Sequence, residues 1–423
     1  MSELIGNLLV AQSGGPTAVI NASVAGVAQQ ARKFAFIQNI YGGLNGILGI
    51  LDEQLIDLNQ ESPETIQALK HTPAAALGTC RYKLDFKKKP DKAAKDMDRL
   101  FQVLQAHNIR YFFYAGGNDS QDTSDKIHHE AVKRGYEMRV IGVPKTIDND
   151  LPHTDHCPGF GSVAKYTACT VLEVAADICS MASDGGSCGI IEVMGRGAGW
   201  IAASTVLAKH CPNDAPHIIL LPEIAFREQE FLDKVKSVIA ELGYCVIVVG
   251  EGLKNVDGSE YSADQLRLDA FGHPVLSGAA VRLGQLITDK LHARARTVTL
   301  GCAQRCAAHY ASATDAAEAA ACGEAAVRAA AEGKSGFMVK IVREPGEVYK
   351  STTGLQPLGD IANVEHPLPR DWITADGFMI NEKFVHYARP LIQGEVKVPM
   401  EDGLPKFAVL RRNLVPKKLP PRS

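Results

Sequence analysis

The sequence has 423 residues, of which 46% are hydrophobic and 22% are charged, and its formal net charge is −3. These values are typical of a globular protein of two or three domains, and they exclude the strong basic field that attracts nucleic acid or an anionic membrane surface. No apolar run approaches the roughly 20 residues that span a bilayer, and the N-terminus lacks the pattern of a signal peptide. The ten cysteines form no Cys-x-x-Cys pair, which favours a reducing, cytoplasmic location.

Short apolar runs alternate with longer amphipathic stretches in the first part of the chain. Strands are predicted at residues 7–11, 36–40, 109–115 and 139–143. Helices are predicted at about 17–32, at 91–107 and from 119 onward. This repetition of strand, loop and helix predicts a parallel sheet with helices on both faces.

The same alternation recurs after residue 160. It predicts strands at 188–193, 217–221, 245–249 and 297–300, and helices at 161–178, from about 200 to 208, at 228–242 and at 315–333. We therefore expect an α/β protein with two doubly wound, Rossmann-like domains that face each other across an active-site cleft. The expected domains are 1–160, completed by 304–345, then 161–303, and a C-terminal extension at 346–423 whose end, 415–423, is predicted to be a loose tail.

Polar and glycine residues follow most of these strands, at the edge where a doubly wound sheet binds its ligands. The most highly charged of these loops lies at residues 143–151, VPKTIDNDL. If this segment is extended, Asp148 and Asp150 point to the same side. Two carboxylates beside Lys145 suggest proton transfer next to a bound phosphate, although an Asp/Asn-rich turn explains these residues equally well.

Other strand-end loops carry groups that suit phosphates. The SGGPT loop at 13–17 lacks the GK[ST] of a Walker A loop, and it reads equally well as a phosphate-binding loop or as a tight turn. In the GGNDS loop at 116–120, Asn118 and Asp119 suit either Mg²⁺ binding or helix capping. Further strand-end residues with the right chemistry for phosphates and sugar hydroxyls are Arg81, Arg196, Glu251, Arg294, Arg296 and Arg305. These loops predict an enzyme of phosphoryl transfer with Asp148 or Asp150 as its base, and they do not specify a substrate.

Taken together, the loops resemble those of the phosphofructokinase family, and most closely its pyrophosphate-dependent branch. The matching segments are SGGPT at 13–17, LGTCR at 77–81, GGNDS at 116–120, PKTIDNDL at 144–151, MGRGAGW at 194–200, GEG at 250–252 and LGCAQR at 300–305. The resemblance implies reversible phosphoryl transfer from pyrophosphate to the 1-hydroxyl of fructose 6-phosphate. It also implies Mg²⁺ as cofactor and a homodimer or homotetramer, in which Arg296 reaches the site of a neighbouring subunit.

The resemblance further implies a role for each residue. Asp148 is the expected proton acceptor and Asp150 its supporting carboxylate, in a catalytic set completed by Lys145, Asp119 and Arg196. The residues expected to bind the sugar phosphate are Thr146, Ile147, Met194, Gly195, Glu251, Arg296, Cys302 and Arg305. The donor phosphates are expected at Gly15, Arg81 and Gly117, and the metal at Asn118.

Two positions bear on the choice of phosphoryl donor. ATP-dependent members of the family have glycine in the place of Asp119 and commonly in the place of Lys145. Asp119 occupies the space and charge of the ATP α-phosphate and should repel ATP. Lys145 can neutralise the leaving phosphate of pyrophosphate. The resemblance thus implies pyrophosphate as the donor, with an ATP-dependent phosphofructokinase as the alternative.

Four places depart from the family pattern, one of which is Cys306-Ala307-Ala308 where GGS usually follows QR. Asn118 stands in place of an aspartate, so a metal contact there would be neutral. Cys302 stands in place of histidine or tyrosine, and Ser187 in place of an arginine. Because these changes remove expected contacts with the sugar phosphate, sedoheptulose 7-phosphate remains open as a substrate. An inactive sugar-phosphate-binding homologue is disfavoured by the intact 144–151 loop.

Overall fold

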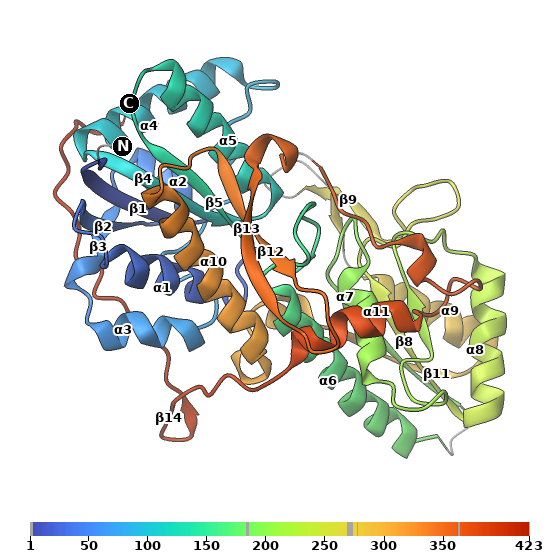
Figure 1. Cartoon of the computed structure of the whole chain (residues 1–423). Helices are drawn as coiled ribbons and strands as arrows, with labels where there is room; N and C mark the ends of the chain where they lie inside the picture. Colours follow the sequence, from blue (N-terminus) through green and yellow to red (C-terminus); the bar gives the residue numbers. More distant parts are fainter. Residues whose placement is uncertain (1–2, 183–185, 269–273, 277, 363, 423) are drawn as a thin grey trace.

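The computed structural model describes residues 3–182, 186–268, 274–276, 278–362 and 364–422, which form two α/β lobes side by side (Figure 1). The first lobe contains a seven-stranded sheet of order β13-β12-β5-β4-β1-β2-β3. Its strands are β1 (Gly6–Gln12), β2 (Ile37–Gly43), β3 (Leu55–Asp57), β4 (Ile109–Gly116), β5 (Arg139–Pro144), β12 (Phe337–Arg343) and β13 (Ser351–Pro357). The inner strands run parallel, and β3 and β13 pair antiparallel at the two edges.

The second lobe contains a four-stranded parallel sheet of order β11-β6-β8-β7. Its strands are β6 (Ser187–Val193), β7 (Ile218–Leu220), β8 (Tyr244–Gly250) and β11 (Arg294–Thr299). Two short hairpins stand apart from both sheets, β9 (Ala263–Leu268) with β10 (Pro274–Leu276), and β14 (Met400–Glu401) with β15 (Leu404–Pro405). The expected α/β class with two lobes is confirmed, and the first sheet is parallel except at its edge strands β3 and β13.

Helices cover both faces of each sheet. Around the first sheet lie α1 (Ile20–Ala31), α2 (Gly46–Leu51), α3 (Pro63–Ala68), α4 (Pro90–Ala106), α5 (Asn118–Lys133) and α10 (Ala313–Ala331). Around the second lie α6 (Phe160–Ser180), α7 (Trp200–Ser204), α8 (Glu228–Leu242), α9 (Ala279–Leu291) and α11 (Glu382–Ala388). Short 3₁₀ helices include η3 (Thr205–Ala208), directly after α7, and η4 (Gly301–Arg305). No helix in the described ranges is long and apolar enough to cross a membrane.

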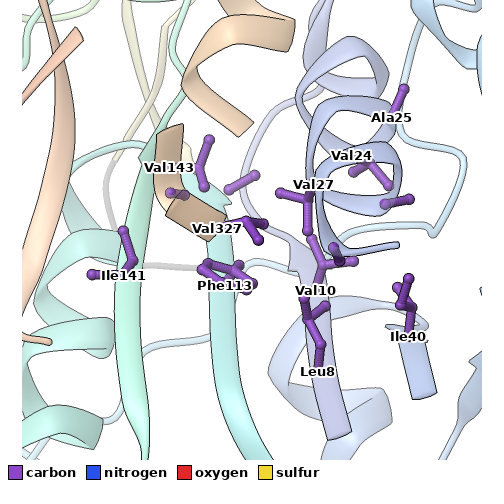
Figure 2. Close-up of a cluster of buried hydrophobic side chains, with 14 of the residues drawn as sticks. Leu8, Val10, Val24, Ala25, Val27, Ile40, Phe113, Ile141, Val143 and Val327 are labelled. Atoms are coloured by element: carbon purple, nitrogen blue, oxygen red, sulfur yellow. The ribbon is translucent and has the colours of Figure 1, made fainter. Parts of the chain in front are cut away.

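Alternation along the central strands explains how the first sheet buries both faces. Leu8 and Val10 of β1 and Phe113 of β4 pack with α1 and α10 on one face (Figure 2). Leu9 and Phe112 point to the opposite face, into the cluster formed with α2, α4 and α5. Because successive side chains of a strand alternate between faces, a continuous apolar run is what a strand covered on both sides requires.

The strand order fixes where ligands can enter the first lobe. From β1 the chain crosses to β2 on one side, and from β4 it crosses to β5 on the other side. The carboxyl ends of the adjacent strands β1 and β4 therefore form a topological switch point, where open α/β sheets have their ligand crevice. The loops at 13–17 and 116–120 leave the sheet at this crevice.

The C-terminal part of the chain runs over both lobes (orange to red in Figure 1). After β13 it crosses to the second lobe, where Phe384 of α11 packs near Trp200 with ring centroids 6.2 Å apart. It then returns to the first lobe, where Lys418 and Arg422 contact Glu53 and Asp96.

The prediction of a loose tail at 415–423 is wrong for the residues that the structure describes. Glu53 is buried, and its carboxylate accepts hydrogen bonds from the backbone N–H of Lys418 (2.8 Å) and of Leu419 (3.1 Å). Arg422 contacts the buried Asp96 at 2.5 Å. A buried carboxylate needs donors, and here the tail supplies them, which fixes its course on the surface.

Candidate active site

Loops from four places in the first lobe meet in a pocket of about 440 Å³. Its lining consists of Ser13, Gly14, Gly15, Cys80, Arg81, Tyr82, Gly117, Asn118, Asp119, Ser120, Lys145, Thr146, Asp148, Asp150 and Glu365. The predicted donor, metal and carboxylate residues of this lobe are thus brought together. Ile147, predicted to bind substrate, is not part of this lining, because its side chain is buried against Phe160 and the core of the second lobe.

Lys145 connects two of these loops. Its Nζ atom donates a hydrogen bond of 2.7 Å to the backbone carbonyl oxygen of Gly15. Burial lowers the pKa of Lys145 to about 8, although Asp148 and Asp150 oppose this shift. The ammonium group therefore lies inside the pocket, held against the glycine loop after β1.

The two carboxylates reach the pocket from a loop that is not fully extended. Asn149, between them, has a φ of 54°, in the left-handed region that Asn tolerates better than most residues. Its side chain accepts a hydrogen bond from the N–H of Cys157 and donates one to the hydroxyl of Tyr387, both at 2.9 Å. The buried Asn149 side chain thus sets the turn that places Asp148 and Asp150 in one pocket.

Burial dominates the acid–base properties of both carboxylates. Together with the negative charges of Asp150 and Glu251, it raises the pKa of Asp148 to about 7. Burial also raises the pKa of Asp150, whose Oδ1 atom is enclosed and has no hydrogen-bond partner among the described residues. A carboxyl group with a pKa near neutrality is suited to accept a proton in catalysis.

The second lobe contributes Arg305 and Glu251 beside this pocket. A Cβ atom built on Gly15 would lie 3.0 Å from the guanidinium of Arg305, so this arginine of η4 reaches the first lobe's glycine loop. Its Nε atom is buried without a hydrogen-bond partner in the described part of the chain. Burial raises the pKa of Glu251 to about 7, although Arg196 lowers it. Both groups are placed to meet a ligand that enters between the lobes.

The loop at 194–200 follows β6 at the same edge of the second sheet. Gly195 has a φ of 116°, and a Cβ atom there would lie 2.7 Å from the carbonyl oxygen of Ala198, so the turn requires glycine. The N–H of Met194 donates a hydrogen bond of 3.1 Å to the Oε1 atom of Gln304. Met194, Gly195 and Arg196 therefore lie on the second lobe's side of the cleft, outside the 440 Å³ pocket.

Two predicted sugar-phosphate residues lie away from this pocket. Arg296 is exposed on β11, an edge strand of the second sheet. Cys302 is exposed at the start of η4. Neither side chain is therefore part of the described pocket that holds the carboxylates.

Two residues of the site were not identified from the sequence. Gln304, which holds the backbone of Met194, lies within the LGCAQR segment, so a search of that motif for side chains that fix the neighbouring loop would have found it. Glu365 lines the pocket from the C-terminal part of the chain. Its sequence surroundings, NVEHPLP, contain no motif that would have singled it out.

The charges of the pocket suit a metal-complexed anion. Its charged lining consists of two cations and four carboxylates, namely Arg81, Lys145, Asp119, Asp148, Asp150 and Glu365. No group of three or more His, Cys, Asp or Glu side chains among the described residues forms a metal site by itself. Mg²⁺ is commonly bound by one or two carboxylates together with substrate phosphates. The lining therefore fits a cation that arrives with a phosphate ligand.

Comparison with known proteins agrees with this geometry. The phosphofructokinase family model matches residues 7–330. The chain is 48% identical to the pyrophosphate–fructose 6-phosphate 1-phosphotransferase of Halomonas elongata and 45% identical to that of Methylococcus capsulatus, over 98% of each chain. The chain superimposes with a TM-score of 0.90 on the crystal structure of a pyrophosphate-dependent phosphofructokinase from Marinobacter aquaeolei. The two sequences are 44% identical, and the match covers 99% of this chain and 100% of the Marinobacter chain. This chain therefore belongs to the phosphofructokinase family.

Proposed function

We propose that this chain transfers a phosphoryl group reversibly from pyrophosphate to the 1-hydroxyl of fructose 6-phosphate, giving fructose 1,6-bisphosphate and phosphate. One observation carries the choice of donor: Lys145 and Asp119 line the same pocket. The lysine offers a fixed positive charge to a small, highly charged leaving group. The aspartate places a negative charge where a nucleotide would continue beyond its second phosphate. The relatives that match over 98% of the chain are pyrophosphate–fructose 6-phosphate 1-phosphotransferases, which supports the same donor.

The first lobe holds the donor in this proposal, and the second lobe holds the sugar phosphate. Gly15 and Gly117 allow the backbone to approach the donor phosphates, and Arg81 and Lys145 neutralise them. Arg305 and Arg196 bind the sugar phosphate, with Glu251 accepting hydrogen bonds from its hydroxyls. Arg305 lies against Gly15, so the two substrates meet where the lobes meet.

Asp148 acts as the base. Its carboxylate takes the proton from the 1-hydroxyl of the sugar as that oxygen attacks phosphorus, and in the reverse direction it returns the proton. Its backbone N–H donates a hydrogen bond of 3.1 Å to the hydroxyl of Thr146, which fixes the loop around it. Phosphoryl transfer needs little covalent help, so positioning and charge stabilisation carry most of the rate.

A divalent cation completes the donor site. Phosphofructokinases generally use a divalent metal, and we propose Mg²⁺ here. Asp150, with its enclosed Oδ1 atom, and Asn118 are the residues of the 144–151 and 116–120 loops that would hold it. When bound, the cation neutralises charge on the donor phosphates. The excess of carboxylates over cations in the lining supports this proposal.

We also propose a cytoplasmic homodimer or homotetramer. Arg296 is exposed on the edge strand β11, where it is free to reach a site that another subunit presents. In that assembly Arg296 binds the 6-phosphate of the neighbour's sugar. The sugar specificity of the enzyme then depends partly on the subunit interface. There, Cys302 and Ser187 replace family residues that contact the sugar phosphate.

An assay with two donors and two sugars tests the function. Pyrophosphate and ATP are each offered with fructose 6-phosphate and with sedoheptulose 7-phosphate, in the presence of Mg²⁺. We expect turnover with pyrophosphate and fructose 6-phosphate. Robust turnover with ATP and none with pyrophosphate would refute the proposed donor. A higher kcat/KM with sedoheptulose 7-phosphate would identify that sugar as the preferred acceptor.

A further inference from the structure

A short piece of the C-terminal chain crosses the cleft at the pocket of about 440 Å³, which we call the donor pocket. We call residues 364–368 the crossing segment. The carbonyl oxygen of Val364 accepts a hydrogen bond of 2.5 Å from the Nδ2 atom of Asn118, and the N–H of His366 donates one of 2.9 Å to the carbonyl oxygen of Asp150. The segment is thereby fixed to the two strand-end loops that form the donor pocket.

The other side of the crossing segment is fixed to the second lobe. The indole N–H of Trp200 donates a hydrogen bond of 2.9 Å to the carbonyl oxygen of His366, and the two rings are stacked with centroids 5.3 Å apart. The N–H of Leu368 donates a hydrogen bond of 3.2 Å to the carboxylate of Glu223. Contacts on both sides hold the backbone of the segment in one position relative to the pocket.

This placement puts the carboxylate of Glu365 at the donor pocket. Glu365 is part of the pocket lining. A Cβ atom on Gly197 would lie 3.1 Å from its Oε2 atom, so the side chain lies over the loop after β6. Asp150 lines the same pocket, and its backbone carbonyl oxygen is held by the N–H of His366, the residue next to Glu365. The two carboxylates are therefore close enough to repel each other when no cation lies between them.

The residue at position 118 leaves the pocket without one carboxylate that the family pattern has. By resemblance, the family has an aspartate where Asn118 stands, and Asn118 uses its amide N–H₂ to hold Val364. An aspartate could not donate that hydrogen bond. Asn118 thus gives up a negative charge in the pocket and at the same time anchors the residue next to Glu365. In addition, the enclosed Oδ1 atom of Asp150 has no hydrogen-bond partner in the described structure, and Asp150 is part of the lining of the same pocket.

We propose that Glu365 supplies a carboxylate to the divalent cation that accompanies pyrophosphate, in place of the one that position 118 lacks. This inference rests on the proposed function, because it assumes a metal-complexed pyrophosphate in this pocket. Glu365 and Asp150 bind the cation directly or through its water molecules, and the donor phosphates complete its shell. The cation removes the repulsion between the two carboxylates.

The experiment measures binding of imidodiphosphate, a pyrophosphate analogue that resists transfer, by calorimetry with Mg²⁺ and with EDTA. The variants are Glu365→Gln, Glu365→Asp and, as a matched control, Glu347→Gln, which removes an exposed glutamate of the same part of the chain. With Mg²⁺ we expect Glu365→Gln to weaken binding about 10- to 100-fold. With EDTA the same change should leave binding equal or tighter, because it removes a like charge. Glu365→Asp should retain most of the Mg²⁺-dependent affinity, and Glu347→Gln should match the wild type.

Two results would overturn the inference. Equal weakening with and without Mg²⁺ would show that Glu365 only supports the crossing segment, and unchanged binding with Mg²⁺ would show that it has no role at the donor. If metal-free binding of imidodiphosphate is too weak to measure, the test is instead the Mg²⁺ concentration at which imidodiphosphate binding is half-maximal. It should rise about tenfold in Glu365→Gln, and an unchanged value refutes the inference. Failure of the proposed function would be separate, since the wild type would then show no turnover with pyrophosphate.

Discussion

The Nζ atom of Lys145 lies 2.7 Å from the backbone carbonyl oxygen of Gly15, and this hydrogen bond joins the loop after β5 to the loop after β1. The lysine is only 3% exposed. Burial lowers its pKa to about 8, with the nearby carboxylates opposing the shift, so most molecules carry the positive charge at pH 7. The contact places one fixed cation between the glycine loop and the catalytic carboxylates.

Replacing Lys145 by methionine tests the role of this cation. Lys145→Met keeps the length of the side chain but removes the charge that stabilises the leaving phosphate. We expect kcat with pyrophosphate to fall by about 10²–10³-fold. Steady-state kinetics give this value, and Lys145→Arg serves as the control that retains a charge. Near-normal turnover in Lys145→Met would contradict the assignment.

The pH dependence of the two reaction directions should differ in sign. Burial, Asp150 and Glu251 raise the pKa of Asp148 to about 7. Phosphorylation of the sugar needs Asp148 deprotonated, so kcat/KM should fall as the pH drops through about 7. The reverse reaction needs it protonated, and this group should make the reverse rate fall as the pH rises through the same value. Measurement of kcat/KM as a function of pH, in the forward and in the reverse direction, tests both expectations.

Two variants serve as controls for the pH profile. Glu251→Gln removes a negative charge that raises the pKa of Asp148, so the acidic limb should move to lower pH. Asp148→Ala should abolish turnover while sugar-phosphate binding stays mostly intact. A forward rate that stays constant between about pH 6 and 8 would argue against Asp148 as the base.

Asp119 should decide whether the pocket accepts ATP. Its carboxylate lines the pocket and forms an ion pair with the Nζ atom of Lys83 at 2.7 Å. Asp119→Gly removes both the bulk and the charge that oppose a nucleotide, so we expect weak ATP-dependent turnover to appear. Asp125→Asn, on the same helix but outside the pocket lining, is the matched control. An Asp119→Gly variant that gains no ATP binding would show that the steric and charge argument is wrong.

A buried histidine should make the stability of the protein depend on alkaline pH. His156 contacts Asp155 through Nδ1 at 2.8 Å and Glu318 through Nε2 at 2.7 Å. Burial alone would lower the pKa of His156, but the two carboxylates raise it to about 9. Because the pKa of His156 is higher in the folded than in the unfolded chain, its protonation stabilises the fold. This stabilisation is complete when the pH is below the unfolded-state pKa of about 6.5. It is lost as the pH rises through the folded-state pKa of about 9.

Thermal unfolding across this range measures the effect of His156. The midpoint for the wild type should decline between pH 7 and a pH above the folded-state pKa of about 9. His156→Gln should start from a lower midpoint and decline less, because it has no proton to lose. The same slope in both proteins would exclude His156 as the source of the dependence.

Removal of the tail should destabilise the first lobe. Deleting residues 416–423 takes away the N–H donors of Lys418 and Leu419 and leaves the carboxylate of Glu53 buried with fewer partners. A lost hydrogen bond to a buried charged group costs about 1.5–3 kcal/mol. We expect a lower midpoint of thermal unfolding than in a chain shortened by Ser423 alone. If the two midpoints agree, the tail contributes nothing to the stability of the lobe.

The sequence determined the central elements of this protein because their signals are local. The apolar runs of β1, β4 and β5, the helical periodicity of α4 and the alanine-rich composition of α10 predicted these elements closely. The helix α8 was predicted with its observed bounds. The same reasoning placed the polar loops at the carboxyl ends of the strands. In a parallel sheet those ends lie at one edge, so the sequence predicted Gly15, Asp119 and Lys145 at the same edge, and the observed order β5-β4-β1 makes their strands neighbours.

Only the tertiary structure decided which distant segments complete the site. Arg305 reaches Gly15, and Glu365 reaches the pocket of the first lobe, because the lobes and the crossing segment pack together over long separations in the chain. The edge strand β13 and the fixed tail were missed for the same reason. Their hydrogen-bond partners, β12 and Glu53, are set by the fold and leave no periodic pattern in the segments themselves. Local propensity therefore specified the strands and their loops, while long-range packing selected the side chains that share the pocket.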